Sequence, residues 1–199
     1  MLGFLLGEKL KIKSIGISNF IWSDQYEELF IEDNIKNEFK LMYQNCDTFF
    51  KYPLSFGLKR LHCKIHELDF HCRSIDYEKI RAIKEKQQQI IFISVGQSAN
   101  VENINIKNFD GIIYYTKGVN VTSENAEINM IDSNELNTQN YIAASDYAII
   151  KAGWGSVSEA IIGKTKMILV ERGSKEDLNM IDEIITNNLG ICVTLKDLE

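Results

Sequence analysis

Two glycine-bearing segments contain the residues best suited to hold a phosphate. They are Gly96, Gln97 and Ser98, and further along the chain Gly153, Trp154, Gly155 and Ser156. A helix is expected to begin at Ser156, and the first turn of a helix presents backbone N–H groups with a partial positive charge. An anionic phosphate is the natural ligand of such a turn. Neither GxGxxG nor GxxxxGK[ST] occurs in the chain, which disfavours nicotinamide enzymes and P-loop NTPases.

A purely structural pattern covers the same residues. Ser156, Val157, Ser158 and Glu159 form an S-x-x-E capping box. In such a box the Ser156 hydroxyl accepts from the N–H of Glu159, and the Glu159 carboxylate accepts from the N–H of Ser156. A phosphate site and an ordinary junction between strand and helix are therefore both compatible with this spacing.

The three histidines lie beside two of the four cysteines, in the group His62, Cys63, His66, His71 and Cys72. Imidazole and thiolate are zinc ligands, but the two cysteines lie nine residues apart rather than in a tight pair. We therefore expect no metal site here. Since nothing marks the chain as secreted, we expect reduced thiols.

From residue 90 onward, short apolar runs alternate with helical or loop segments. Strands are expected at residues 90–95, 111–115, 127–131, 147–150, 165–170 and 191–194. Their near-continuous Ile, Val, Leu and Tyr content is typical of parallel strands buried on both faces. In the doubly wound order 3-2-1-4-5-6, the first and fourth strands flank the point where the strand order reverses. The two glycine-bearing segments follow these strands, so they are predicted to line one crevice.

Helices are expected to separate some of these strands. One should run over residues 156–162 and end at Gly163. Another should run over residues 177–188, with Leu178, Ile181, Ile185 and Leu189 on its apolar side. The alternation predicts an α/β fold with a Rossmann-like, doubly wound parallel sheet.

The first 75 residues are less regular. Strands are expected at 13–20 and 48–52, with a helix between them that carries Ile35, Phe39, Met42 and Cys46 on one face. Two strands cannot make a complete doubly wound domain. We therefore expect a partial N-terminal α/β lobe at 1–75 and a Rossmann-like lobe at 76–199, with Asp76 capping a helix at the boundary.

Composition sets limits on the partners. The 199 residues include 22 basic and 28 acidic side chains, a net charge of −6, and 45% apolar residues. This balance gives no basic footprint for nucleic acid. No apolar run approaches the roughly 20 residues of a membrane-spanning helix, and none resembles a signal peptide. We expect a cytoplasmic protein with no integral membrane segment.

The segment from Ala143 to Ala160 resembles the donor-binding half of GT-B glycosyltransferases of the MurG and family 28 type, most specifically over Gly153 to Glu159. The strand ending at Val170 and the following Glu171, Arg172 and Gly173 are similar to that family's strand and turn. The similarity continues into its acidic helix start, here Glu176, Asp177, Leu178 and Asn179. Residues 90–98 resemble its opening strand and loop. Residues 16–22 resemble a strand and turn of the acceptor half.

The resemblance implies roles for individual residues. Ser156 and Val157 would meet the diphosphate of a nucleotide sugar, and Glu159 would accept from the ribose hydroxyls. Gly96, Gln97 and Ser98 would close the other side of the crevice. Arg172, Glu176, Asp177 and Asn179 would lie at the donor sugar or its diphosphate, although acidic residues also favour any helix N-terminus.

The implied activity is transfer of a sugar, expected to come from a UDP-sugar, to the hydroxyl of an unknown acceptor. No cofactor or metal is expected. The N-terminal part carries neither the glycine-rich acceptor loop nor the catalytic base of the family, so no catalytic residue is assigned. A second chain supplying an acceptor lobe, a non-catalytic nucleotide-sugar-binding or partner-binding module, and a nucleotide-sugar hydrolase or epimerase are the alternatives.

Overall fold

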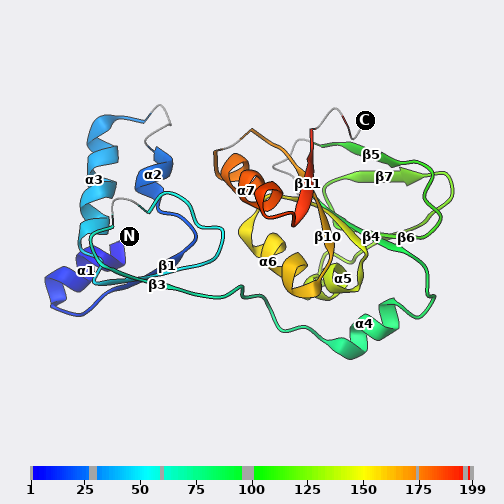
Figure 1. Ribbon diagram of the computed structural model, residues 1–199, viewed down its shortest axis with the longest axis horizontal. Coiled ribbons are helices and arrows are strands. Elements are labelled where there is room, and N and C mark those ends of the chain that lie inside the picture. Colours follow the sequence, from blue (N-terminus) through cyan, green and yellow to red (C-terminus); the bar gives the residue numbers. More distant parts are fainter. Residues whose placement is uncertain are drawn as a thin grey trace. The chain divides into compact units, whose positions relative to one another are not determined.

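The computed structural model divides the chain into two compact units, Met1–Phe70 (unit 1) and His71–Glu199 (unit 2). It describes residues 2–26, 31–58, 61–95, 101–173, 175–194 and 197, with the backbone alone for residues 175 and 176. Each unit is described by itself below, with the elements labelled in Figure 1.

Unit 2 is built around a six-stranded parallel sheet. Its strands are β4 (Ile90–Ser94), β6 (Ile112–Tyr115), β8 (Glu127–Met130), β9 (Tyr147–Lys151), β10 (Lys166–Val170) and β11 (Gly190–Val193). Their order across the sheet is β11-β10-β9-β4-β6-β8, and every neighbouring pair is parallel. Counted along the chain from β4, this is the predicted order 3-2-1-4-5-6. The predicted α/β fold class with a doubly wound parallel sheet is confirmed.

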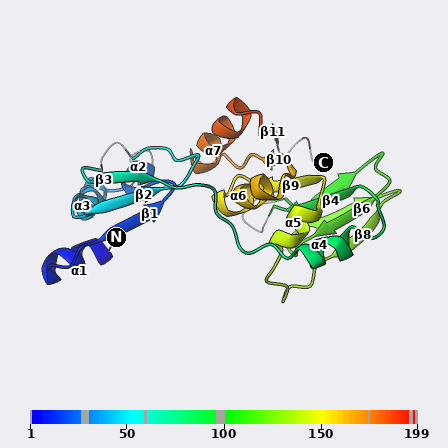
Figure 2. The same ribbon diagram turned by 60° about the horizontal axis from the view of Figure 1, so that its bottom comes forward.

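The sheet of unit 2 is covered on both faces. Ile90, Ile91, Phe92 and Ile93 of β4 are each at most 8% exposed, although successive side chains point to opposite faces. Helix α5 (Gln139–Ala144) contacts β4, and helix α6 (Trp154–Gly163) contacts β9 and β10 (Figure 2). A Cβ on Gly163 would lie 2.8 Å from the Cα of Ala143, so this glycine permits the close approach of α5 and α6.

A two-stranded parallel ribbon covers part of the other face. It consists of β5 (Asn103–Ile106) and β7 (Asn120–Ser123), which lie in the connections from β4 to β6 and from β6 to β8. Ile104 and Val121 of the ribbon pack in one apolar cluster with Ile91 and Ile93. Neither strand was predicted from the sequence, because each is four residues long with a single buried side chain.

Helix α7 (Lys175–Thr186) buries a different face from the one predicted. Met180, Ile181 and Ile184 are buried, whereas Leu178 and Ile185 are 46% and 47% exposed. Apolar residues occur on both sides of this helix, so their spacing does not fix its rotation. The buried Asp177, which binds Arg172 as described below, lies on the same side as Met180 and Ile184 and sets that rotation.

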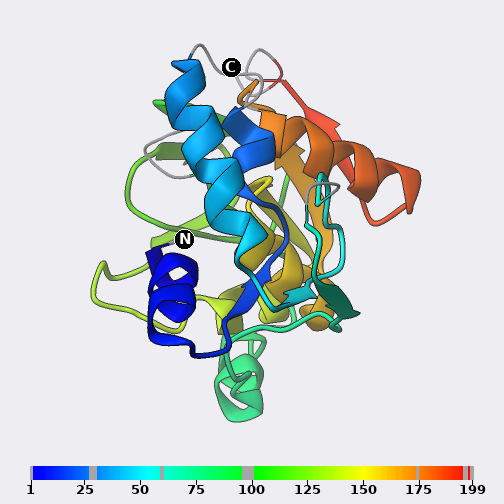
Figure 3. The same cartoon turned by 90° about the vertical axis from the view of Figure 1, so that its left-hand side faces the viewer.

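Unit 1 contains a smaller parallel sheet. Its elements are α1 (Leu2–Leu10), β1 (Ile15–Ser18), α2 (Trp22–Tyr26), α3 (Asp33–Gln44), β2 (Thr48–Lys51) and β3 (Lys64–Glu67). The strand order is β1-β2-β3. Helix α1 lies at one end of α3 and α2 beside the other (Figure 3). Phe4, Tyr43 and Phe49 form the centre of the core between these helices and the sheet.

The outer face of β1 is uncovered. Ile15 and Ile17 are 61% and 57% exposed, whereas Gly16, which points to the opposite face, lies against Phe49 and Phe4. Parallel sheets are ordinarily covered on both faces. Within the described residues of unit 1, this face of β1 therefore lacks the layer that would bury it.

Helix α4 (Tyr77–Ile83) begins unit 2 with the predicted cap. The Asp76 carboxylate accepts hydrogen bonds from the N–H of Glu78, at 3.0 Å, and of Lys79, at 3.1 Å. Among the described residues, no helix has the length and apolar content needed to cross a membrane.

Replacement of Gly16 by Ala should destabilise unit 1. The added Cβ would lie 2.5 Å from Cδ2 of Phe49 and 3.1 Å from Cζ of Phe4. Overpacking of this kind costs about 1–3 kcal/mol of unfolding free energy. Gly3→Ala is the matched control, because its Cβ would meet nothing within 4 Å and a helical alanine stabilises by about 0.5–1 kcal/mol. Urea denaturation followed by Trp22 fluorescence in a Trp154→Phe background measures both. Equal stability of the two variants would contradict the close packing at Gly16.

The acid stability of unit 1 should depend on Asp47. Hydrogen bonds from the backbone N–H of Ser14, at 2.7 Å, and from its hydroxyl, at 3.0 Å, lower the pKa of the Asp47 carboxyl. A lowered pKa contributes stability above the unfolded-state pKa of about 3.9, and this contribution is lost as the pH falls through the native pKa. Asp47→Asn should therefore lower the urea midpoint at pH 6, and the difference from the unsubstituted protein should shrink as the pH falls through the lowered native pKa. A constant difference at every pH would exclude this role.

Candidate functional site

The carboxyl ends of β4 and β9 lie side by side in the sheet of unit 2. The two strands pair in parallel, with Ile91 opposite Tyr147 and Ser94 opposite Ile150. From here the chain proceeds to β6 and β8 on one side and to β10 and β11 on the other. This is the point at which ligands bind in open α/β sheets. Gly96, Gln97 and Ser98, which follow β4, lie outside the described residues, so their part in this crevice stays a prediction.

The N-terminus of helix α6 follows β9 directly. The helix begins at Trp154, and its N-cap is Gly153 in an extended conformation, with no side-chain hydrogen bond at the cap. The first intrahelical donor is the N–H of Val157, which donates to the carbonyl of Gly153 at 3.1 Å. The N–H groups of the preceding turn are therefore the ones that an anion would meet. A Cβ on Gly155 would meet nothing within 4 Å, so the space beside this turn is unfilled by described residues.

The predicted capping box is wrong. Helix α6 starts two residues before Ser156, which places Ser156 inside the first turn rather than at the cap. Glu159 consequently has no N-cap to close. Its carboxylate instead accepts a hydrogen bond from Nε of Arg73, at 2.9 Å. The Val157 side chain is fully buried in the core, and its N–H is engaged within the helix, so neither is available to the diphosphate contact that the resemblance implied.

Three polar residues at the same sheet edge were not singled out from the sequence. Ser94 is the last residue of β4, and Thr116 directly follows β6; the Thr116 hydroxyl donates to that of Ser94 at 3.0 Å. Lys151 ends β9, and its Cε lies 3.5 Å from the position that a Cβ on Gly153 would take. A cation beside the uncapped helix turn suits an anionic ligand. Only the alignment of parallel strands brings these residues to one place.

The residues that follow β10 are engaged with one another. The guanidinium of Arg172 binds the Asp177 carboxylate in a bidentate manner, Nε to Oδ2 at 2.7 Å and Nη2 to Oδ1 at 2.5 Å. The side chains are 19% and 1% exposed. Asp177 thus contacts protein in this structure. Asn179 is half-buried in the same helix, and the Glu176 side chain lies outside the described residues.

The histidine and cysteine group is dispersed over both units. Cys63 packs near Cys46 in the core of unit 1, whereas His66 stacks on Phe50 with ring centroids 5.0 Å apart. Burial, together with the neighbouring Cys63, raises the pKa of Cys46 to about 11. His71 and Cys72 belong to unit 2. The described residues contain no group of three His, Cys, Asp or Glu side chains able to hold a metal ion.

Comparison with known proteins gives a fold but no family. No family model and no curated protein matches the chain. Among solved structures, the glycosyltransferase SnogD from Streptomyces nogalater superposes with a TM-score of 0.58 at 11% identity, over 83% of this chain and 50% of that one. The kitacinnamycin glycotransferase superposes with a TM-score of 0.59 at 10% identity, over 96% of this chain and 60% of that one. UGT89C1 from Arabidopsis thaliana in complex with UDP superposes with a TM-score of 0.58 at 13% identity, over 96% of this chain and 55% of that one.

These similarities establish that the chain has the fold of part of a glycosyltransferase. They do not single out the MurG type. The chain spans 50% to 60% of the length of these structures.

Breaking the Arg172–Asp177 pair should destabilise unit 2. Asp177→Asn would remove the charge of the carboxylate that binds a largely buried guanidinium, and breaking such a pair costs about 3 kcal/mol of unfolding free energy. The control is Glu78→Gln, whose partner Arg81 is 74% exposed; exposed pairs of this kind contribute under about 1 kcal/mol. Urea denaturation monitored by Trp154 fluorescence measures both variants. If both lost the same small amount, the pair would not fix the rotation of α7.

Proposed function

We propose that unit 2 is the donor-binding lobe of a GT-B glycosyltransferase and binds a nucleotide sugar, with UDP as the nucleotide. The observation that carries this proposal is the uncapped N-terminus of α6, which lies at the reversal point of a sheet with a glycosyltransferase fold. UGT89C1, one of the similar structures, was solved with UDP and with UDP-L-rhamnose. The resemblance of residues 143–160 to the MurG and family 28 type supports the same donor class.

In the proposed site, the first turn of α6 holds the diphosphate. The backbone N–H groups of Trp154, Gly155 and Ser156 donate to its oxygens, and Lys151 supplies a positive charge beside them. Glu159 accepts from the ribose hydroxyls. Arg172 and Asp177 do not contact the donor directly; their ion pair holds the turn before α7 in place beside the site. Asn179 lies further along that helix.

The proposed reaction places negative charge where this helix turn can stabilise it. An acceptor hydroxyl oxygen attacks the anomeric carbon, the bond from that carbon to the diphosphate breaks, and the acceptor proton goes to a base. Donors already oriented toward the leaving diphosphate lower the barrier without rearrangement. No base is assigned within the described residues, and the reaction as written needs no metal.

Unit 1 is proposed to be part of an acceptor-side lobe. The exposed Ile15 and Ile17 on the uncovered face of β1 support the proposal that further elements pack on this face in a larger lobe. The chain also spans only 50% to 60% of the length of the similar structures, which supports the same proposal. A second chain could supply these elements. The alternative function is a non-catalytic nucleotide-sugar-binding module.

Replacement of Ser156 by Asp separates ligand binding from helix stability. A carboxylate in the first turn of α6 favours the helix, so thermal stability should hold or rise. The same charge would repel a diphosphate and should lower UDP affinity by at least about tenfold, or 1.4 kcal/mol. Calorimetric titration with UDP measures this, and Ser133→Asp in an exposed turn is the charge-matched control.

Two results would count against the proposal. Unchanged UDP affinity in Ser156→Asp would show that the diphosphate does not bind at the first turn of α6. Absence of UDP binding by the unsubstituted protein would reject the donor site. UDP binding without release of UDP from UDP-glucose or UDP-N-acetylglucosamine would favour the binding module or a missing acceptor lobe.

A further inference from the structure

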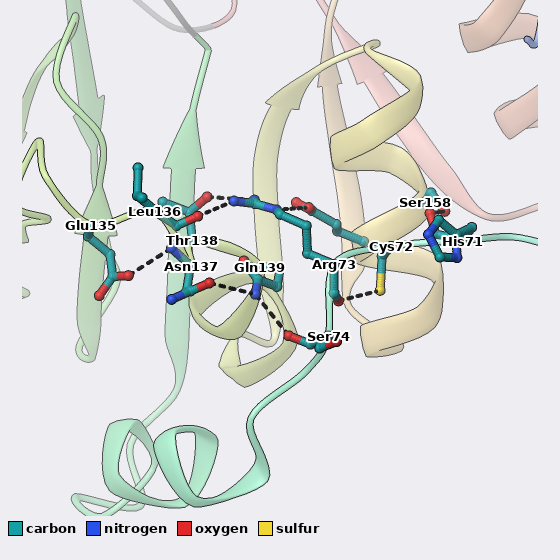
Figure 4. Close-up of polar contacts among 11 residues, drawn as sticks. His71, Cys72, Arg73, Ser74, Glu135, Leu136, Asn137, Thr138, Gln139 and Ser158 are labelled. Atoms are coloured by element: carbon teal, nitrogen blue, oxygen red, sulfur yellow. Dashed lines mark hydrogen bonds and ion pairs between the residues drawn. The ribbon is translucent and has the colours of Figure 1, made fainter.

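The segment from His71 to Asp76 is fastened to helices α5 and α6 by buried polar side chains. The Ser158 hydroxyl donates to the carbonyl of His71 at 2.7 Å, and the Gln139 amide donates to the carbonyl of Ser74 at 2.9 Å (Figure 4). Ser158 is 0% exposed and Gln139 is 2% exposed. Since buried polar groups are costly unless they are hydrogen-bonded, these contacts hold the segment in one conformation.

Arg73 is the centre of this arrangement. Its Nε donates to Oε1 of Glu159 at 2.9 Å and its Nη2 donates to the Thr138 hydroxyl at 3.0 Å. Its Nη1 also donates to the carbonyl of Leu136 (Figure 4). Three acceptors on α6 and on the segment before α5 thus fix the plane of one guanidinium. Lysine could not reproduce this planar set of donors.

The consequence for Glu159 is a carboxylate held in place before any ligand arrives. Its side chain is only 9% exposed, and Arg73 engages Oε1. A carboxylate offers about four lone-pair positions on two oxygens, so the contact with Arg73 leaves acceptor capacity on Oε2. An acceptor that is already oriented binds a hydroxyl without losing further side-chain freedom.

We propose that Arg73 is a positioning residue of the ribose subsite and acts through Glu159. This inference rests on the proposed function, because it requires that Glu159 accept from the ribose. Arg73 orients the carboxylate, and Glu159 then distinguishes ribose from 2′-deoxyribose by the hydroxyl that only ribose carries. The segment that begins unit 2 therefore takes part in nucleotide selectivity.

The test compares UDP with 2′-deoxy-UDP in calorimetric titrations of the whole chain. Arg73→Ala should lower UDP affinity about five- to tenfold and change 2′-deoxy-UDP affinity by less than about twofold, because a charge-assisted hydrogen bond to one hydroxyl is affected. Arg73→Lys should resemble Arg73→Ala. In a Glu159→Gln background, the further replacement of Arg73 should have no additional effect on the ratio of UDP affinity to 2′-deoxy-UDP affinity.

Two variants keep the result interpretable. Arg81→Ala removes an arginine that is 74% exposed and paired within α4, and it should leave both affinities unchanged. Thr138→Val removes one acceptor of the guanidinium without changing charge, and it should also lower the ratio of UDP affinity to 2′-deoxy-UDP affinity. This variant replaces Arg73→Ala in the test if Arg73→Ala proves too unstable to titrate.

The possible failures are distinguishable. Equal losses for both nucleotides would indicate a merely structural role and overturn the proposal, while UDP binding itself would survive. Tighter UDP binding by Arg73→Ala would mean that the guanidinium competes with ribose for Glu159, which also overturns it. Absence of UDP binding by the unsubstituted protein would reject the proposed function and this inference together.

Discussion

Parallel pairing between β4 and β9 is the interaction on which the candidate site depends. Because the strands run in one direction, their carboxyl ends meet at one edge of the sheet. Because the chain leaves β4 toward β6 and leaves β9 toward β10, neither connection crosses the gap between the two ends. The N-terminus of α6 follows β9 after only two residues, so the same pairing places the first turn of that helix at this edge.

The starting residue of α6 decides what its polar side chains can do. With Gly153 at the cap, Ser156 lies in the first turn and Glu159 lies beyond the reach of a capping role. Ser158 and Glu159 are then directed to His71 and Arg73, which the chain reaches more than 80 residues earlier. Two adjacent residues of α6 therefore fasten the start of unit 2, and one of them is the residue that the proposed ribose contact uses. In the proposed site, structural support and ligand recognition share this carboxylate.

Unit 1 presents the opposite situation, an apolar surface without a covering layer. Gly16 and Phe49 face the helices and are tightly packed, but Ile15 and Ile17 on the other face of β1 remain exposed. In unit 2 the same kind of parallel sheet has helices on one face and the β5–β7 ribbon on the other. The contrast supports the interpretation of unit 1 as part of a larger lobe.

The sequence by itself determined the six strands of unit 2, their doubly wound class and the helix cap at Asp76. These features depend on contiguous apolar runs and local capping, which neighbouring residues set among themselves. Tertiary structure alone decided the rotation of α7, the partner of Glu159 and the hydrogen bond between Thr116 and Ser94. The α7 pattern had two apolar sides, and the buried Arg172–Asp177 pair chose between them. A contact such as that of Arg73 with Glu159 joins residues far apart in the chain, and no local pattern of residue types specifies it, because its energy exists only once the sheet has brought both elements together.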